Sequence, residues 1–175
     1  VREVTSWVME IAKIPVWAKM TPNITHIIDP GERALEAGAD GLAAINTILS
    51  VMGVDLETLR PQPTVEGYSV PGGYSCKAVR PIALRMVMEL ARMMEGKYSD
   101  RTISGIGGIE TGEEAAQFIL LGAHTVQVCT GVMIHGYGMV KEMNESLLAF
   151  MEKHSFETLD DFRGASLPYF STHAD

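Results

Sequence analysis

The stretch from Arg101 to Gly131 constrains the fold of this chain more than any other. An apolar run with β-branched residues, from Thr102 to Ile106, has the length and composition of a buried strand. A helix should follow, because Thr111 and Glu114 have the Thr-x-x-Glu spacing of a capping box ahead of an apolar stretch. A second apolar run comes next. The order strand, helix, strand predicts two parallel strands that end side by side.

Both strands of this unit end in loops of the kind that hold a phosphate. Gly107 and Gly108 follow the first strand, and their missing side chains let an anion approach backbone N–H groups. The second strand, Thr125 to Cys129, is followed by Thr130 and Gly131. In (β/α)8 barrels, the loops after the last two strands form a recurrent phosphate site. The spacing therefore favours a phosphate-bearing ligand, and a plain tight turn at the two glycines is the alternative.

Composition limits the classes of function. The chain has 175 residues with 46% hydrophobic content, enough for one domain with a buried core. Its net charge of −8 argues against nucleic acid or an acidic membrane as partner, since those surfaces need clustered Lys and Arg. The two cysteines, Cys76 and Cys129, are far apart, and the five histidines share no ligand spacing, so no metal site is predicted. Two distant cysteines encode no disulfide framework, which favours a reducing cytoplasm, and neither a membrane span nor a signal peptide is recognised.

Two more strands are predicted upstream, and each has polar residues near its end. Residues 16–20 form an apolar run in which Lys19 is the one charged residue. A lysine there is costly unless its ammonium meets an anion at the barrel mouth or reaches solvent, and both alternatives stay open. The next strand covers residues 41–45, and Asn46 and Thr47 follow it. Their side chains suit a small planar ligand, although they can also cap a turn.

The remaining segments supply helices and one long loop. Residues 48–74 contain several prolines and glycines that exclude a long helix, so they are predicted to be an irregular lid or binding loop held by apolar anchors, with a disordered insertion as the alternative. The tail, residues 164–175, is expected to be loosely held or to link to a further domain. Helices are predicted over residues 1–14, from Pro30, from Arg80, over 140–154 and, as a short final helix, over 156–163.

Four strand–helix units amount to half of a (β/α)8 barrel, whose full length is about 250 residues. The predicted fold class is therefore α/β, with four parallel strands in half of such a barrel. Half a barrel leaves two strand edges and a row of inward apolar side chains uncovered. We therefore expect additional covalent sequence or a partner chain to cover them, and a homo-oligomer is one form this can take.

Six segments, taken together, resemble a known family. They are VWAKMTPNITHI, AINT, GGYSCKAVRPIALRMV, ISGIGGIETGEEAAQF, GAHTVQVCTGVM and LDDFRG, in this order along nearly the whole chain. They resemble the FMN-binding barrel of the dihydropyrimidine dehydrogenases, particularly the catalytic subunit of the bacterial NAD-dependent enzymes, within the class 1 dihydroorotate dehydrogenase-like family. The resemblance implies that residues 1–163 are the C-terminal half of that barrel.

The resemblance also implies roles for individual residues. The family exchanges hydride between FMN and uracil or thymine, forming or consuming the 5,6-dihydro pyrimidines. Lys19 matches a lysine beside the pyrimidine edge of the flavin, and Gly73 matches a glycine that lets its loop pack close to the cofactor. Asn46 and Thr47 match residues that hydrogen-bond the pyrimidine substrate. The flavin phosphate segment matches Ile106, Gly107, Gly108, Cys129 and Thr130.

One catalytic group of the family has no match in this chain. The general acid of the family is a cysteine on an earlier loop, which the resemblance places upstream of Val1. Neither Cys76 nor Cys129 matches it, so no catalytic residue is assigned here, and the fragment alone is expected to be inactive. Electrons are expected from NAD or NADP through FAD and iron–sulfur clusters, carried on other domains or on a partner subunit.

Three other hypotheses stay open. The first is dihydroorotate oxidation by the same kind of barrel. The second is a phosphate-binding barrel lyase or isomerase in which Lys19 is the catalytic lysine, as a Schiff-base or general-base residue. The third is a non-catalytic half-barrel that only self-associates. Bound flavin would separate the first hypothesis from the other two.

Overall fold

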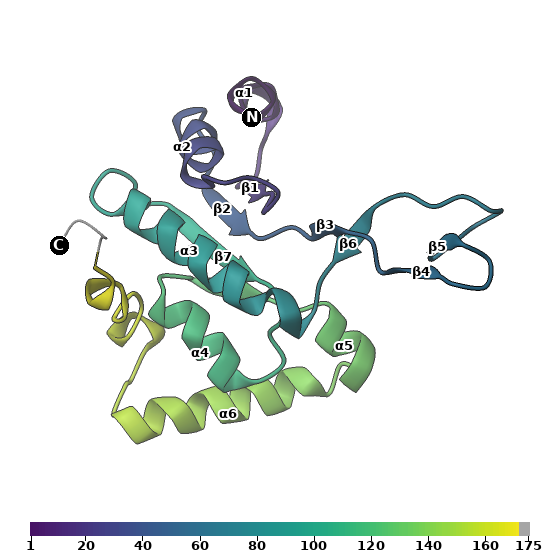
Figure 1. Cartoon of the computed structure of the whole chain (residues 1–175). Helices are drawn as coiled ribbons and strands as arrows, with labels where there is room; N and C mark the ends of the chain where they lie inside the picture. The colour runs from purple at the N-terminus through teal and green to yellow at the C-terminus, as the bar shows by residue number, and fades with distance from the viewer. Residues whose placement is uncertain (172–175) are drawn as a thin grey trace.

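The computed structural model of the chain describes residues 1–171 and is organised around a four-stranded parallel sheet (Figure 1). The strand order is β1-β2-β7-β8, and all three pairings are parallel. The predicted α/β organisation with four parallel strands is thus confirmed, and β1 and β8 form the two edges. The strands are β1 (Trp17–Met20), β2 (Gly41–Ala44), β7 (Thr102–Ile106) and β8 (Thr125–Gln127).

The main helices pack on one side of this sheet, where α3 lies across β7 and α4 packs beside α3 and against β8 (Figure 1). Helix α2 begins at Ile28, ahead of the predicted start at Pro30. A proline is tolerated in a first turn because the N–H that it lacks would have no intrahelical partner. The helices are α1 (Arg2–Ile11), α2 (Ile28–Glu36), α3 (Arg80–Met94), α4 (Gly112–Leu120), α5 (Thr130–His135) and α6 (Met139–His154).

The hydrophobic core lies between the sheet and these helices. Alternate residues of the strands point toward the helices, and Leu42 of β2 and Ile103 of β7 are almost completely buried there. Helix α3 contributes Val87 and Leu90 from one face, both fully buried. Burial of such aliphatic side chains, at roughly 1.5–3 kcal/mol each, is what fixes the helices on this side.

The capping box predicted at the start of α4 is confirmed. The Thr111 hydroxyl accepts a hydrogen bond from the Glu114 N–H at 3.2 Å, and the Glu114 carboxylate accepts from the Thr111 N–H at 3.2 Å. The side chains at this helix end therefore satisfy two of its free N–H groups.

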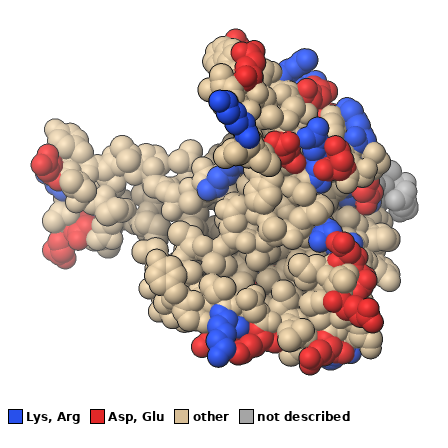
Figure 2. Space-filling model, turned by 180° about the vertical axis from the view of Figure 1, so that it is seen from behind, with Lys and Arg blue, Asp and Glu red and all other residues tan. Residues whose placement is uncertain are grey.

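The opposite face of the sheet is mixed and not an apolar row as expected, because small and polar side chains lie on it beside Trp17 and Ile106. The register places Lys19, Ala43, Ser104 and Thr125 in one row on this face. Ser104 is fully buried, and its hydroxyl accepts hydrogen bonds from Thr125 Oγ1 and Gln127 Nε2, both at 2.9 Å. Figure 2 shows this side, with charged groups mostly around its margin.

Two further expectations for β1 need correction. The strand begins at Trp17, and it is not a buried strand, because Trp17 and Lys19 are both exposed. As an edge strand with one uncovered face, β1 leaves the Lys19 ammonium in contact with solvent without a burial cost.

Residues 48–74 form an ordered arm instead of the predicted irregular loop. Figure 1 shows the arm projecting away from the helices. Antiparallel pairing holds β3 (Ile48–Ser50) to β6 (Gly72–Tyr74), and β4 (Gly53–Asp55) to β5 (Arg60–Gln62). The expected apolar anchors are also wrong, because every one of them is more than half exposed. They are Val51, Met52, Val54, Leu56, Leu59 and Tyr68.

The C-terminal segment is more firmly packed than predicted. In place of a final α-helix over 156–163, there is a single 3-10 turn, η2 (Leu159–Asp161), beside the fully buried Phe162. The loose tail expected from Gly164 is wrong for residues 164–171, since the Gly164 N–H donates to Ile119 O at 3.0 Å and Leu167 is buried. Residues 172–175 of that tail lie outside the described residues. The other 3-10 helices are η1 (Lys77–Val79) and η3 (Leu167–Tyr169).

The contact between α4 and α6 depends on a glycine. A Cβ atom added at Gly112 would lie 2.2 Å from Leu147 N and 2.4 Å from Met143 O. Backbone atoms cannot yield as a flexible side chain does, so we expect Gly112→Ala to lower the free energy of unfolding of the full-length protein by about 1–3 kcal/mol. Urea denaturation measures this change.

Gly138→Ala is the matched control for this substitution. Gly138 has φ −57°, which alanine adopts freely, and an added Cβ would meet nothing within 4 Å. Its free energy of unfolding should stay within about 0.5 kcal/mol of the wild-type value. Equal unfolding midpoints for the two alanine variants would contradict the proposed close packing.

Candidate functional site

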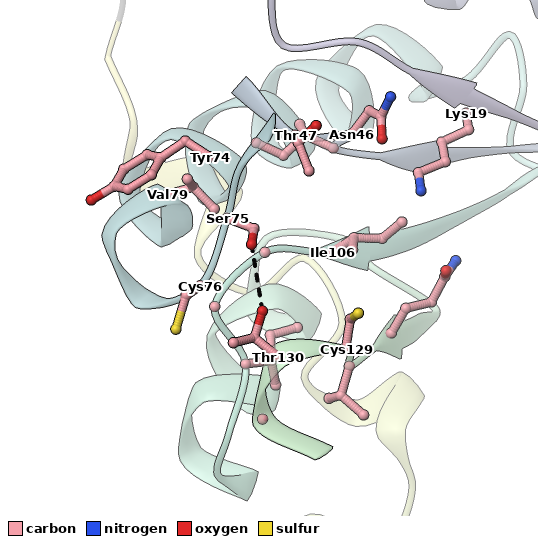
Figure 3. A pocket seen from close by; sticks show the side chains of 17 residues that line it. Lys19, Asn46, Thr47, Tyr74, Ser75, Cys76, Val79, Ile106, Cys129 and Thr130 are labelled. Atoms are coloured by element: carbon pink, nitrogen blue, oxygen red, sulfur yellow. Dashed lines mark hydrogen bonds between the residues drawn. The ribbon is translucent and has the colours of Figure 1, made fainter. Parts of the chain in front are cut away.

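A pocket of about 170 Å³ lies at the carboxyl ends of the parallel strands, where the loops after β2, β7 and β8 meet (Figure 3). Parallel strands that are joined by right-handed crossovers present their carboxyl ends at one edge, which brings these loops together. The pocket is lined by Lys19, Ile45, Asn46, Thr47, Tyr74, Ser75, Cys76, Val79, Ile106, Gly107, Gly108, Ile109, Gln127, Val128, Cys129, Thr130 and Gly131.

The structure brings together nearly all the residues that the sequence singled out. Figure 3 shows Lys19 and Asn46 across the pocket from Cys129 and Thr130. Eight site residues predicted from the sequence line the pocket: Lys19, Asn46, Thr47, Ile106, Gly107, Gly108, Cys129 and Thr130.

Gly73 is the one predicted site residue that does not line the pocket. A Cβ atom at this position would lie 2.3 Å from Thr47 Oγ1, so the glycine allows β6 to approach the residue that follows β2. Its position in the structure supports Thr47, which does line the pocket. A direct contact between Gly73 and a ligand stays a prediction.

Backbone pairing fixes the loop after β2. The Ile45 N–H donates to Ile106 O at 3.0 Å, and the Asn46 N–H donates to Met20 O at 2.9 Å. The loop therefore continues the strand pairing for two residues beyond β2, with Ile45 bonded on the β7 side and Asn46 on the β1 side. This anchoring leaves the Asn46 and Thr47 side chains exposed at the pocket.

The glycine pair after β7 has backbone geometry that other residues avoid. Gly107 has φ 140° and Gly108 has φ 72°. A Cβ atom at Gly108 would lie 2.8 Å from Cys76 O and 2.9 Å from Lys77 Cα. Among residues 1–171, no acceptor pairs with the N–H groups of Gly108 and Ile109. The glycines thus permit a close loop contact and leave backbone donors free.

Three consecutive pocket residues were not anticipated from the sequence. Tyr74 ends β6, and Ser75 and Cys76 connect this strand to η1. Ser75 Oγ lies 3.5 Å from Thr130 Oγ1, so hydroxyls from two loops meet (Figure 3). A signal for them does exist, because they lie between a glycine pair and the predicted helix start at Arg80. Gln127 was also missed, although alternation along β8 predicts that it faces the same side as Thr125.

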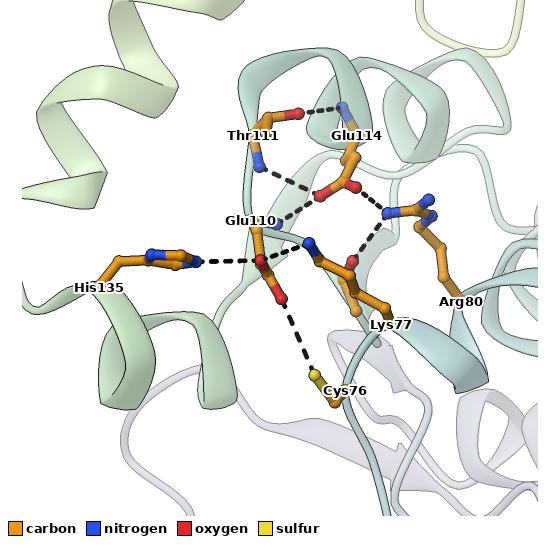
Figure 4. A network of polar contacts seen from close by, with 8 residues as sticks. Cys76, Lys77, Arg80, Glu110, Thr111, Glu114 and His135 are labelled. Atoms are coloured by element: carbon orange, nitrogen blue, oxygen red, sulfur yellow. Dashed lines mark hydrogen bonds and ion pairs between the residues drawn. The ribbon is translucent and has the colours of Figure 1, made fainter.

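Two carboxylates behind the pocket hold its walls together (Figure 4). The Glu110 carboxylate accepts hydrogen bonds from Lys77 Nζ at 2.9 Å and from His135 Nε2 at 3.1 Å. The Lys77 ammonium, followed by His135, lowers the pKa of Glu110, and Glu110 in turn raises the pKa of Lys77. Glu110 is therefore ionised at neutral pH.

Glu114 makes a second tie through the same segment. Its carboxylate accepts from the Glu110 N–H at 2.7 Å and from the guanidinium of Arg80. Arg80 also donates to Gly108 O at 3.1 Å. The first turn of α3 is thus connected to the glycine turn by a hydrogen bond and to the start of α4 by an ion pair, both partly buried.

The chemistry of the lining suits an anion beside a planar, hydrogen-bonding group. None of the 17 lining residues is Asp or Glu, and Lys19 supplies the one ammonium group. Hydroxyls come from Thr47, Ser75 and Thr130, and Asn46 supplies an amide that can donate and accept in one plane. Free backbone N–H groups and a cation, without a competing carboxylate, favour binding of a phosphate.

Residues 1–171 contain neither a cluster of metal ligands nor a membrane-spanning helix. No three His, Cys, Asp or Glu side chains gather closely enough in this part of the chain to hold a metal ion. Within the same residues, every helix is too short or too polar to cross a membrane.

Comparison with known proteins gives one family and several close relatives. The model of the dihydroorotate dehydrogenase family matches residues 1–151. A chloroplastic dihydropyrimidine dehydrogenase (NADP(+)) from Arabidopsis thaliana is 62% identical over 99% of this chain and 41% of its own length. The NAD-dependent dihydropyrimidine dehydrogenase subunit PreA of Escherichia coli K12 is 46% identical over 86% of this chain and 36% of its own length.

A third relative is named for a different activity. The catalytic subunit of dihydroorotate dehydrogenase B (NAD(+)) from Alkaliphilus metalliredigens is 39% identical over 94% of this chain and 51% of its own length. The chain spans about two fifths of the length of the two dihydropyrimidine dehydrogenases that it matches.

The close approach of the glycine turn can be tested with a matched pair of variants. Gly108 and Gly96 have φ 72° and φ 77°, but an added Cβ meets backbone within 3 Å only at Gly108. Both alanine variants carry the cost of a left-handed backbone, so their difference isolates the steric contact. We expect Gly108→Ala to lower the free energy of unfolding by about 1–3 kcal/mol more than Gly96→Ala. Equal losses, measured by urea denaturation of the full-length protein, would exclude a tight contact.

Proposed function

Since the chain belongs to the dihydroorotate dehydrogenase family, we propose that it forms part of an FMN-dependent dihydropyrimidine dehydrogenase, which interconverts uracil or thymine with their 5,6-dihydro forms. The observation that carries the choice of substrate is the 62% identity to a dihydropyrimidine dehydrogenase over 99% of the chain. Identity to the dihydroorotate dehydrogenase B subunit cited above is lower, at 39%.

The residues of the pocket fit the phosphate end of FMN. The N–H groups of Gly108 and Ile109 are free to donate, and so are those in the first turn of α5, which begins at Thr130. The Thr130 hydroxyl adds a donor, and no lining carboxylate repels the phosphate. These groups would hold the cofactor through backbone donors, which explains how apolar Ile106 can belong to such a segment.

The pocket in this chain is one part of the proposed cofactor site. Its volume of about 170 Å³ is below the roughly 300–1,000 Å³ of typical cofactor pockets. Since the chain spans about two fifths of its dihydropyrimidine dehydrogenase relatives, we propose that the remaining length of the protein supplies the rest of the site. The general acid, which the family resemblance assigns to a cysteine outside this chain, belongs to that remainder.

FMN, when bound, supplies hydride transfer to and from carbon 6 of the pyrimidine ring. Lys19 would lie at the edge of the ring system, where its ammonium stabilises negative charge that develops during the reaction. Asn46 and Thr47 would orient the pyrimidine, because its alternating N–H and C=O groups need both donors and acceptors. These three side chains are exposed on neighbouring strand ends that line the pocket.

The remaining proposals concern electron supply and surroundings. Electrons would come from NAD or NADP through FAD and iron–sulfur clusters on other domains or on a partner subunit, and the word subunit in the name of the E. coli relative supports a partner. Homo-oligomer formation and a cytoplasmic location also stay predictions. The net charge of −8 supports the absence of nucleic acid among the partners.

The direct test is the visible spectrum of the purified full-length protein. Bound FMN should give the yellow absorption of oxidised flavin, and dihydrouracil added without oxygen should bleach it. Bleaching by dihydroorotate but not by dihydrouracil would instead establish the second candidate function, which the 39% identity to a dihydroorotate dehydrogenase B subunit supports. Absence of flavin from a protein that stays unable to take up FMN would rule out both.

Lys19→Ala should slow flavin reduction without removing FMN. Loss of a charge that acts on the transition state costs on the order of tenfold to 100-fold in rate, whereas the phosphate contacts stay in place. Anaerobic stopped-flow mixing with dihydrouracil measures the rate. Lys13→Ala, which removes an exposed lysine outside the pocket, is the control and should match the wild type. Unchanged kinetics in the Lys19 variant would remove Lys19 from the mechanism.

Asn46→Ala should weaken the use of pyrimidine with little effect on flavin content. The loss of one polar partner in the bound complex costs about 1–3 kcal/mol, which corresponds to roughly 5-fold to 150-fold in kcat/KM. Steady-state assays with uracil and NAD(P)H measure this ratio. Asn144→Ala, on the exposed surface of α6, should leave it unchanged. If both variants behave alike, Asn46 does not contact the substrate.

A further inference from the structure

One wall of the pocket has a backbone conformation that is normally reserved for glycine. Cys76 has φ 74° and ψ −164°, a region that residues with a side chain occupy only under constraint. Cys76 lines the pocket, and its carbonyl oxygen is the atom that an added Cβ at Gly108 would meet at 2.8 Å. Contacts from the surrounding structure must therefore hold this turn in place.

The side chain that holds the Cys76 turn is Glu110. Its Oε1 accepts from Cys76 Sγ at 3.8 Å, and its Oε2 accepts from Lys77 Nζ at 2.9 Å (Figure 4). Two consecutive residues of the strained turn are thus bound to one carboxylate. Glu110 itself follows the glycine turn after β7, so the contacts join the two loops that approach each other at Gly108.

The same carboxylate also reaches a third wall of the pocket. His135, the last residue of α5, donates from Nε2 to Glu110 Oε2 at 3.1 Å. Helix α5 begins at Thr130, which lines the pocket at its opposite end. Glu110 therefore contacts the turn before α3 and the end of α5, and it is covalently part of the loop after β7.

Glu110 acts from behind the pocket and not within it. Its side chain is only 6% exposed, and it is not among the residues that line the pocket. A buried carboxylate is costly unless cations and donors compensate it, and Lys77 and His135 do so here. Because Glu110 does not line the pocket, its contacts are explained by the positioning of the loops that it joins and not by binding of a ligand.

We propose that Glu110 is a positioning residue for cofactor binding, which holds the strained turn at Cys76 against the glycine turn and α5. The proposal rests on the proposed function, because the loops concerned are those assigned to the FMN phosphate. The second tie, from Arg80 to Glu114 and Gly108 O, does not involve the Glu110 side chain. Variants at Glu110 should therefore keep the fold, but the turn at Cys76 should no longer be held at its close distance from the glycine turn after β7.

The test compares Glu110→Gln, Cys76→Gly and the double variant in the full-length protein. The dissociation constant of FMN is measured by fluorescence titration of flavin-free protein, and the melting temperature is measured beside it. Glu110→Gln removes the charge that binds Lys77, and we expect FMN to bind about tenfold more weakly. Glu113→Gln, an exposed carboxylate in the same segment without a role in the network, should bind FMN as the wild type does.

The double variant separates positioning from a general loss of structure. Glycine adopts the conformation of residue 76 without strain, but it also removes the Sγ contact with Glu110 and a side chain that lines the pocket, so the FMN affinity of Cys76→Gly is measured as the reference for the double variant. In that background the Glu110→Gln change should cost less than about threefold, because the strain that Glu110 holds in the wild type is gone. A merely structural role of Glu110 would lower the melting temperature equally in both backgrounds and would not produce this rescue.

Several results would overturn the proposal. An unchanged dissociation constant for Glu110→Gln would do so, and so would an equal loss of affinity with and without Cys76→Gly. If Glu110→Gln fails to fold, Lys77→Gln replaces it, since Lys77 is exposed and its loss breaks the same ion pair. Unchanged FMN binding by that variant would also reject the proposal. Failure of the wild-type protein to bind FMN would reject the proposed function itself, which distinguishes the two.

Discussion

The close approach of two loops, at Gly108 and Cys76, is the contact on which the pocket depends. No side chain fits at Gly108, because the backbone of residues 76 and 77 already occupies that space. The approach brings the end of the arm against the phosphate-type turn after β7. Two ties, one through Glu110 and one through Arg80 and Glu114, act across this contact, so charged groups outside the pocket decide its shape.

The parallel sheet supplies the frame in which this contact forms. Pairing in the order β1-β2-β7-β8 delivers one polar or flexible loop from each strand to the same edge. The helices bury the outward side chains, whereas the other face carries small and polar groups such as Ser104 and Thr125. The side chains that stabilise the fold and the side chains that face the site thus lie on opposite faces of the sheet, because side chains alternate along each strand.

Much of the parallel sheet and several of the pocket residues could be predicted from the sequence, for identifiable physical reasons. The capping box at Thr111 and the strand from Thr102 to Ile106 are local signals, since neighbouring residues alone determine them. Strand-end positions such as Lys19 and Asn46 were also predictable, because parallel strands share one carboxyl edge. The arm was not, since short antiparallel pairs such as β4 with β5 depend on contacts that composition does not reveal. Ser75 was missed although a glycine pair and a predicted helix start flank it, because its partner Thr130 lies 55 positions away in the sequence.

The sequence by itself determined the four parallel strands with their main helices, the glycine turn and the family of the chain, because periodicity, capping and close identity are properties of the residues in order. Only the tertiary structure decided that Glu110 joins three segments, that Cys76 adopts a glycine-like conformation and that Gly73 supports Thr47 from outside the pocket. The reason is distance along the chain: Cys76 and Glu110 are 34 positions apart, and no local pattern encodes which carboxylate will face which turn once the sheet has formed.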